Sequence, residues 1–103
     1  MIIQRVGFFL EPNFSTISFA SAIEPLRMAN YLSGQALYEP LLLSQDGELV
    51  RASNGMRVQP DHSIEDAPDL HMLLVCGPTP LPSGENRVLK QWLRRLVRRG
   101  TQI

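Results

Sequence analysis

Two short and almost uninterrupted apolar runs constrain this sequence most. Residues 2–10 read IIQRVGFFL and residues 70–76 read LHMLLVC, and each run ends at a turn that contains proline. Apolar runs of this length are typical of strands buried on both faces, which occur mainly in parallel sheets covered by helices. The sequence therefore predicts buried strands over 2–10 and 70–76.

Two segments with helical periodicity follow these runs. The first begins after a cap at Ser15 or Thr16 and ends at Ser33-Gly34, and Pro25 within it predicts a kink or a late start. Its predicted inner face is formed by Phe19, Ile23, Leu26 and Asn30, with Ala22, Ala29 and Leu32 beside them. The second covers about 85–99, with Ser83 as its cap and Gly100 as its end. Its apolar face is predicted to contain Val88, Leu89, Trp92, Leu93, Leu96 and Val97.

The remaining elements complete an alternating order. Residues 37–44 predict a strand, in which Pro40 favours an edge position. Residues 49–52 and 56–59 predict a hairpin around Asn54-Gly55, and 60–68 predict a polar connector with at most one helical turn. Residues 101–103 begin another strand. This order predicts an open α/β sheet, which binds ligands beyond the carboxyl ends of its strands.

Composition excludes several classes of protein. Among 103 residues, 44% are hydrophobic and 19% are charged, which argues against disorder and allows one domain at most. The apolar runs are far shorter than the ~20 residues that cross a bilayer, so no membrane span is expected. The single cysteine, Cys76, rules out an internal disulfide. It fits a reducing compartment, and we expect a cytoplasmic location.

The charges are unevenly distributed although they sum to zero. All ten acids and four of the ten bases lie in residues 1–86, and residues 87–99 hold the other six bases. A basic helix face can contact nucleic acid, a membrane surface or an acidic partner. A solvated face, with arginine stems covering apolar surface, explains the same charges and is favoured because no DNA-reading motif accompanies them.

Three segments together resemble a known family. They are VGFFLEPNFSTISFASAIEPLRMAN (6–30), LSQDGELVRASNGMRVQPD (43–61) and APDLHMLLVCGP (67–78). In order and spacing they resemble the N-terminal domain of GlxA-type transcriptional regulators of the AraC family, which is similar to the ThiJ/PfpI and class I glutamine amidotransferase-like fold. The resemblance implies a flavodoxin-like, open and mostly parallel sheet with helices on both faces. It also implies a homodimer.

The resemblance further implies how function is divided along the chain. Residues 1–103 are expected to be the N-terminal part of an effector-sensing domain that appears truncated, because its last strand stops after three residues. A C-terminal helix-turn-helix domain, which binds DNA in such regulators, is expected but absent from these residues. The expected activity is therefore sensing of a small metabolite that controls DNA binding.

An enzyme is the main alternative, as the front half of a ThiJ/PfpI-type cysteine hydrolase or amidotransferase. In enzymatic relatives the nucleophilic cysteine would lie just after Ile103. Ser18 stands where those relatives carry a glutamate, and Gly77-Pro78 stands where many carry Gly-Gly, so one oxyanion-hole donor is missing. Cys76 ends the preceding strand and is expected to be inert. We therefore predict no catalysis. A third alternative is an interaction module with a vestigial pocket.

The predicted effector pocket lies between the loops that follow the strands 2–10 and 70–76. Glu11 beside Phe14 suits a cationic ligand, by charge and by cation–π contact. Relatives in this branch respond to amine catabolites such as glycine betaine, carnitine or arginine, so the resemblance favours the same chemistry. In the alternative reading Glu11 faces solvent and Phe14 staples the helix start. The full set of predicted ligand contacts is Glu11, Asn13, Phe14, Gly77, Pro78 and Thr79.

Neither a metal nor a cofactor is expected. His62 and His71 are the only histidines, and no Cys or His pair has the spacing of metal ligands. The loop after the first strand lacks the glycines that let a backbone cradle a phosphate.

Overall fold

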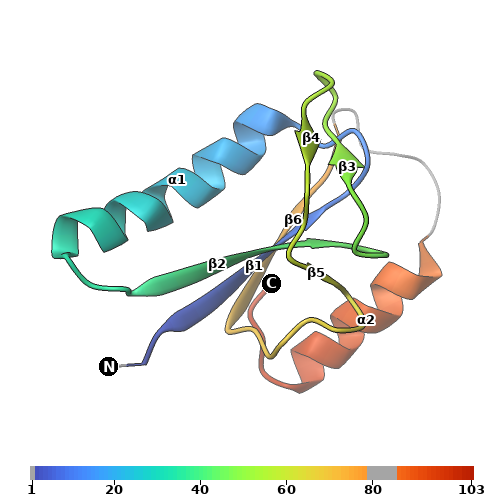
Figure 1. Cartoon of the computed structure of the whole chain (residues 1–103). Helices are drawn as coiled ribbons and strands as arrows, with labels where there is room; N and C mark the ends of the chain where they lie inside the picture. The colour runs from blue at the N-terminus through green and yellow to red at the C-terminus, as the bar shows by residue number, and fades with distance from the viewer. Residues whose placement is uncertain (1, 79–85) are drawn as a thin grey trace.

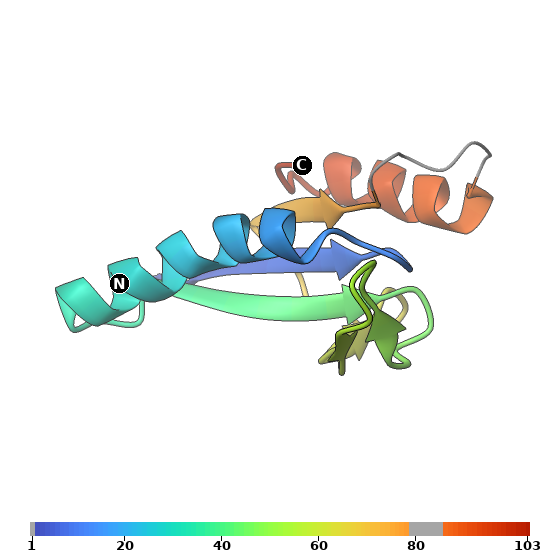
Figure 2. The same ribbon diagram turned by 90° about the horizontal axis from the view of Figure 1, so that it is seen from above.

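The computed structural model describes residues 2–78 and 86–103. Four parallel strands form one sheet in the order β5-β2-β1-β6, with β1 at Gln4–Leu10, β2 at Tyr38–Ser44, β5 at His62–Ser63 and β6 at Met72–Cys76. Helices α1 (Thr16–Ser33) and α2 (Arg87–Arg98) cover opposite faces (Figures 1 and 2). Strands β3 (Val50–Arg51) and β4 (Arg57–Val58) form an antiparallel hairpin. The predicted parallel sheet with helices on both faces is confirmed.

Strand β1 separates two hydrophobic cores. Its side chains alternate, so Val6, Phe8 and Leu10 pack on the side of α1 whereas Phe9 packs on the side of α2. Gly7 lies on the α2 side, where a Cβ atom would come within 2.7 Å of Leu70 Cδ1. The absence of a side chain at Gly7 therefore lets the leucines of the α2 core close over the middle of the strand.

Helix α1 begins where the sequence predicts. The Ser15 side chain accepts a hydrogen bond from the Ser18 amide, and Gly34 ends the helix with a φ of 68°. The helix runs from Thr16 through the exposed Pro25, so the predicted late start is wrong. The prediction that Leu32 lies beside the inner face of the helix is also wrong. Leu32 lies about 120° around the helix from Leu26 and is 75% exposed.

Asn30 joins the end of α1 to the start of β2. Its Nδ2 donates to the Tyr38 carbonyl at 2.8 Å, and its Oδ1 accepts from the amides of Leu37 and Tyr38 at 2.9 and 3.0 Å. One half-buried side chain thus satisfies three backbone groups of the connection. Asn30 belongs to the predicted inner face of the helix, but it stabilises the fold through hydrogen bonds and not through apolar packing.

Pro40 has an edge position within β2, as predicted. The short β5 pairs only with Leu43 and Ser44, so the earlier part of β2 has a neighbour only at β1. The Leu42 amide donates to Asp61 Oδ2, and the Leu42 carbonyl accepts from the Asp61 amide. The backbone amide and carbonyl of Leu42 therefore both point away from β1. Pro40 lies two residues earlier and directs its nitrogen to the same open side, where no donor is needed. The sequence did not predict β5, which lies in the polar connector.

Helix α2 starts later than predicted. Its N-cap is Asn86, whose Oδ1 accepts from the Leu89 amide at 3.1 Å, whereas the predicted cap Ser83 lies outside the described residues. Leu89, Trp92 and Leu96 are buried in the core that contains Phe9. Val88 and Val97 are 50% and 61% exposed, so they do not belong to the buried face.

The chain returns to the sheet after α2. Gly100 has a φ of 90°, and Gln102 forms a parallel bridge with Met72 on the outer edge of β6. Of the strand predicted to begin at 101–103, the structure shows this one bridge. Within the described ranges, neither helix has the length and apolarity needed to cross a membrane.

Candidate functional site

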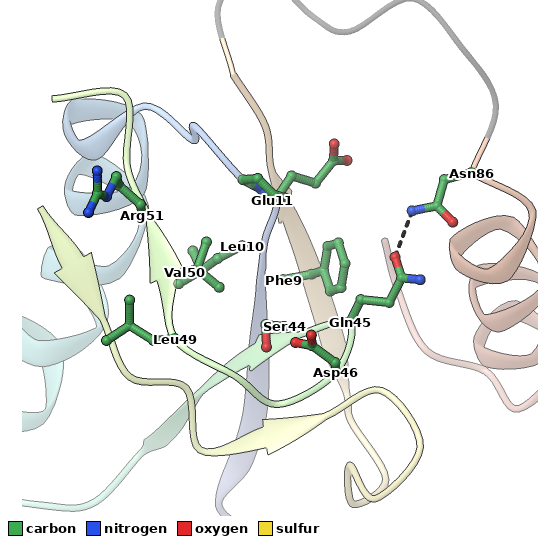
Figure 3. Close-up of a pocket in the computed structure, with 11 residues that line it drawn as sticks. Phe9, Leu10, Glu11, Ser44, Gln45, Asp46, Leu49, Val50, Arg51 and Asn86 are labelled. Carbon is green, nitrogen blue, oxygen red and sulfur yellow. Dashed lines mark hydrogen bonds between the residues drawn. The ribbon is translucent and has the colours of Figure 1, made fainter. Parts of the chain in front are cut away.

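A cavity of about 360 Å³ lies at the carboxyl ends of β1 and β2 (Figure 3). The hairpin and the start of α2 close its sides. Four segments of the chain therefore meet at one place, which open parallel sheets commonly use for ligands. Its lining residues are Phe9, Leu10, Glu11, Pro12, Ser44, Gln45, Asp46, Leu49, Val50, Arg51 and Asn86.

The turn after β2 is held by its own hydrogen bonds. The Ser44 hydroxyl donates to the Glu48 carbonyl at 3.0 Å, and Asp46 Oδ1 accepts from the Glu48 amide at 3.0 Å. Gly47 has a φ of 79°, which favours glycine there. These contacts fix the positions of Ser44 and Asp46 at the mouth of the cavity.

Asn86 and Gln45 join two walls of the cavity. Asn86 Nδ2 donates to Gln45 Oε1 at 2.8 Å, as Figure 3 shows with a dashed line. The oxygen of the same side chain, Oδ1, caps α2. The start of α2 is therefore held both to its own first turn and to the turn after β2.

The cavity combines carboxylates with an apolar wall. Glu11 is half-buried and Asp46 is exposed, whereas Phe9, Leu10 and Val50 supply buried apolar surface. Arg51 is the one cation in the described lining of the cavity, and its guanidinium points away from both carboxylates (Figure 3). Among the residues that the structure describes, neither carboxylate forms an ion pair. This arrangement suits a small molecule with a cationic group and an apolar body.

Among the predicted ligand contacts that the structure describes, Glu11 is the one that lines this cavity. Asn13 lies in the loop after β1 with a φ of 66°, and its amide donates to the Arg51 carbonyl at 2.8 Å, so it ties this loop to the hairpin. Phe14 is fully buried and packs edge-to-face on Phe19, with ring centroids 5.8 Å apart. Phe14 therefore belongs to the α1 core, and the predicted pairing of Glu11 with Phe14 around a cation is not formed.

Gly77 and Pro78 line a different pocket, on the side of α1. This pocket, also about 360 Å³, is bordered by Ser18, Ala22, Leu74, Val75 and Cys76. Backbone hydrogen bonds join the loop after β1 to the described start of the loop after β6. The Glu11 amide donates to the Cys76 carbonyl at 3.0 Å, and the Ser15 amide donates to the Gly77 carbonyl at 3.2 Å. The predicted contact Thr79 lies outside the described residues.

Cys76 is a buried thiol at the end of β6. It is 8% exposed, and burial raises its pKa to about 11. A thiol with this pKa carries its proton at neutral pH and is a poor nucleophile. In the described part of the chain, no three His, Cys, Asp or Glu side chains converge in a way that could hold a metal ion.

Sequence reasoning missed five polar residues of the cavity, which are Ser44, Gln45, Asp46, Arg51 and Asn86. Gln45 and Asp46 follow β2 at the same sheet edge as Glu11, so their place after a predicted strand was an available signal. Asn86 gave no such signal, because its contribution depends on how α2 packs against the sheet.

Comparisons with known proteins relate this chain to HTH-type transcriptional regulators. It is 42% identical over 100 residues to the HTH-type transcriptional regulator GbdR of Pseudomonas aeruginosa, covering 97% of this chain and 27% of that protein. It is 38% identical over 102 residues to the HTH-type transcriptional regulator GlxA of Rhizobium meliloti, covering 98% of this chain and 32% of that protein. The chain thus spans about a third or less of these relatives. No protein-family model matches it.

Solved structures give the same relationship for the fold. An AraC family transcriptional regulator from Pseudomonas putida matches with a TM-score of 0.83 and 29% identity, over 95% of this chain and 52% of that one. The DJ-1 superfamily protein Atu0886 from Agrobacterium tumefaciens matches with a TM-score of 0.72 and 22% identity. The match covers 96% of this chain and 50% of that one. The predicted fold class and the predicted resemblance are confirmed.

Proposed function

We propose that this chain, which is homologous over nearly its whole length to part of the GlxA-type regulators of the AraC family, is a piece of an effector-sensing domain. The effector is a small metabolite with an amine or quaternary ammonium group. One observation carries this proposal: Glu11 and Asp46 line a cavity of about 360 Å³ at the carboxyl ends of two parallel strands.

The charge and size of the cavity support this class of ligand. Two carboxylates and one outward-pointing arginine favour a cation over an anion. The buried ring of Phe9 and the side chain of Val50 can contact the apolar part of the ligand. A volume of about 360 Å³ lies at the low end of the range for small-molecule sites, which favours a metabolite of modest size.

In this proposal, sensing and DNA binding belong to different domains. Residues 1–103 are the front part of the sensing domain, and a C-terminal helix-turn-helix domain contacts DNA. The regulator acts as a cytoplasmic homodimer. The relatives support this division because they are named as HTH-type regulators and are about three times as long as this chain.

We infer that the domain is not catalytic. The buried, protonated thiol of Cys76 supports this inference, as does Pro78, which offers no amide hydrogen beside Gly77. Ser18 lines the pocket beside them and supplies no carboxylate.

Thermal melts of the chain with glycine betaine, carnitine and arginine test the proposal. A ligand that binds only the folded state at about 100 times its Kd adds about 2.7 kcal/mol of stability, so at least one of these probes should raise the Tm. Glu11→Gln should weaken the binding of that probe about tenfold or more, because it removes a charged partner. Glu39→Gln is the matched control, because Glu39 lies at the other end of β2. The proposal fails if no probe shifts the Tm, or if Glu11→Gln binds as the unchanged chain does.

A further inference from the structure

We infer that the outer face of α2 binds the phosphate backbone of duplex DNA. We call Arg87, Lys90, Arg94 and Arg98 the basic stripe. None of these residues lines the effector cavity, so the inference goes beyond the proposed sensing role. It rests on the proposed function only in that a regulator brings this domain close to DNA.

The basic stripe lies opposite the buried face of the helix. Leu89, Trp92 and Leu96 point into the core, whereas all four cations of the stripe are exposed. Spacings of three and four residues place these cations on one side of a helix, over about 16 Å of its axis. In Figures 1 and 2 no other described element lies beyond α2, so this side is open.

Arg95 and Arg98, in the last turn of α2, favour the helix through its dipole, but other charges of α2 oppose its stability. The helix and its C-cap contain six bases and no acid. Arg94 and Arg98 are four residues apart and repel each other, as do Lys90 and Arg94. Arg87 occupies the first helical position, where the helix dipole disfavours a cation. An anion bound along the stripe would relieve all of these unfavourable contacts.

The rest of the chain leaves most of these charges available. Arg99 lies 3.9 Å from Asp69, an exposed pair that is weak in water. In the ranges 2–78 and 86–103, no ion pair involves Arg87, Arg94 or Arg98. These three guanidinium groups therefore keep their capacity for charge-assisted hydrogen bonds to phosphate oxygens.

The surroundings of the stripe favour a duplex over other polyanions. Duplex DNA carries one charge per about 1.7 Å of its axis when both strands are counted, so the stripe is as long as a piece of duplex that carries about ten phosphate charges. Single strands are bound by stacking on exposed aromatic rings, but Trp92 is 4% exposed. Membrane-binding helices insert an apolar face, but the apolar face of α2 is already packed on the sheet.

Fluorescence anisotropy with a labelled duplex of arbitrary sequence tests the inference. Binding should be weak, with a Kd of about 10⁻⁴ to 10⁻⁶ M, and should decrease steeply between about 50 and 200 mM salt. The double variant Arg94→Gln/Arg98→Gln should reduce the slope of log K against log salt by about 1.8, because two phosphate contacts are lost. The sequence pI of about 6.7 means that net charge alone does not produce such binding.

The double variant Arg27→Gln/Arg57→Gln is the matched control. It removes the same charge from α1 and β4, and it should leave the affinity and the salt slope unchanged. All four positions are exposed, and circular dichroism verifies that both variants stay folded. Equal weakening by both variants, or no binding by the unchanged chain at about 50 mM salt, would overturn the inference.

Two further measurements separate the alternatives. Polyglutamate that binds as tightly as the duplex would point to an acidic protein partner and overturn the choice of DNA. The amine probes should shift the Tm of the Arg94→Gln/Arg98→Gln variant as they shift that of the unchanged chain. If the unchanged chain responds to an amine probe but does not bind the duplex, this inference falls and the sensing role stays in place.

Discussion

The side chain of Asn86 donates a 2.8 Å hydrogen bond to Oε1 of Gln45, which lies 41 residues earlier in the chain. Asn86 also caps α2, so one residue contributes to helix stability and to the shape of the cavity. Movement of the first turn of α2 would therefore alter the cavity wall at Gln45. The two contributions can be separated, because they use different atoms of the same amide.

Replacement of Asn86 separates capping from wall formation. Asn86→Ala removes both contacts and should destabilise the chain by about 1 kcal/mol, lowering the Tm by about 4–8 °C. Asn86→Asp keeps the capping oxygen but cannot donate to Gln45, so it should stay near the original stability. Both variants should weaken binding of the amine probe, because both lose the contact that holds Gln45 in the cavity wall. Equal destabilisation by Ala and Asp in urea unfolding would contradict the capping role.

Phe14 should contribute to stability and not to ligand binding. It is fully buried beside Phe19, so Phe14→Ala should lower the free energy of unfolding by about 3–5 kcal/mol. Ile17→Ala is the control, because Ile17 is exposed and should change stability by less than about 0.5 kcal/mol. Urea titrations measure both values. A small effect at Phe14 would mean that its ring is not part of the α1 core.

A methyl group at Gly7 should destabilise the chain, because leucine side chains would have to shift to make room for it. The added Cβ would lie 2.7 Å from Leu70 Cδ1 and 3.2 Å from methyl carbons of Leu43 and Leu73. Gly7→Ala should therefore cost about 1–3 kcal/mol through overpacking. Adding Leu70→Val removes the nearest methyl carbon and should recover part of this loss. A double-mutant cycle measures the coupling, and strict additivity would argue against the predicted clash.

Burial of Cys76 predicts a decrease in stability at high pH. The thiol pKa rises from an ordinary 9.0 to about 11 in the folded chain, because burial disfavours the thiolate. The unfolded chain loses this proton first, so the stabilising difference is complete below pH 9.0 and decreases as the pH rises towards about 11. Cys76→Ala has no thiol to titrate. The free energy of the original chain minus that of Cys76→Ala should therefore decrease from pH 8 to pH 11, and a constant difference would contradict the shift.

Local patterns were sufficient to predict most of the fold. The apolar runs around Phe8 and Leu73 identify strands, and the caps at Ser15 and Gly34 depend only on neighbouring residues. The open side of β2 was predictable because Pro40 lacks an amide hydrogen. The short β5 has no comparable local signal, since its two residues are placed by pairing with Leu43 and Ser44.

The site was harder to predict because it depends on contacts between distant segments. Glu11 could be identified from its place after a buried strand. Phe14 follows three residues later, but burial against α1 removes it from the cavity. Gly77 was expected beside Glu11 at the same sheet edge, yet it lines a separate pocket on the side of α1. No sequence pattern placed Asn86 opposite Gln45, because this contact requires α2 to be docked on the sheet.

The packing of Phe9 against Trp92 gives this chain an optical property. Phe9 lines the cavity, and its ring centroid lies 5.7 Å from that of Trp92, the single tryptophan of the sequence. Indole emission from a buried position is sensitive to a shift of its neighbours. A molecule that enters the cavity and displaces the Phe9 ring should therefore change the intrinsic fluorescence, so occupancy can be followed without attaching a dye.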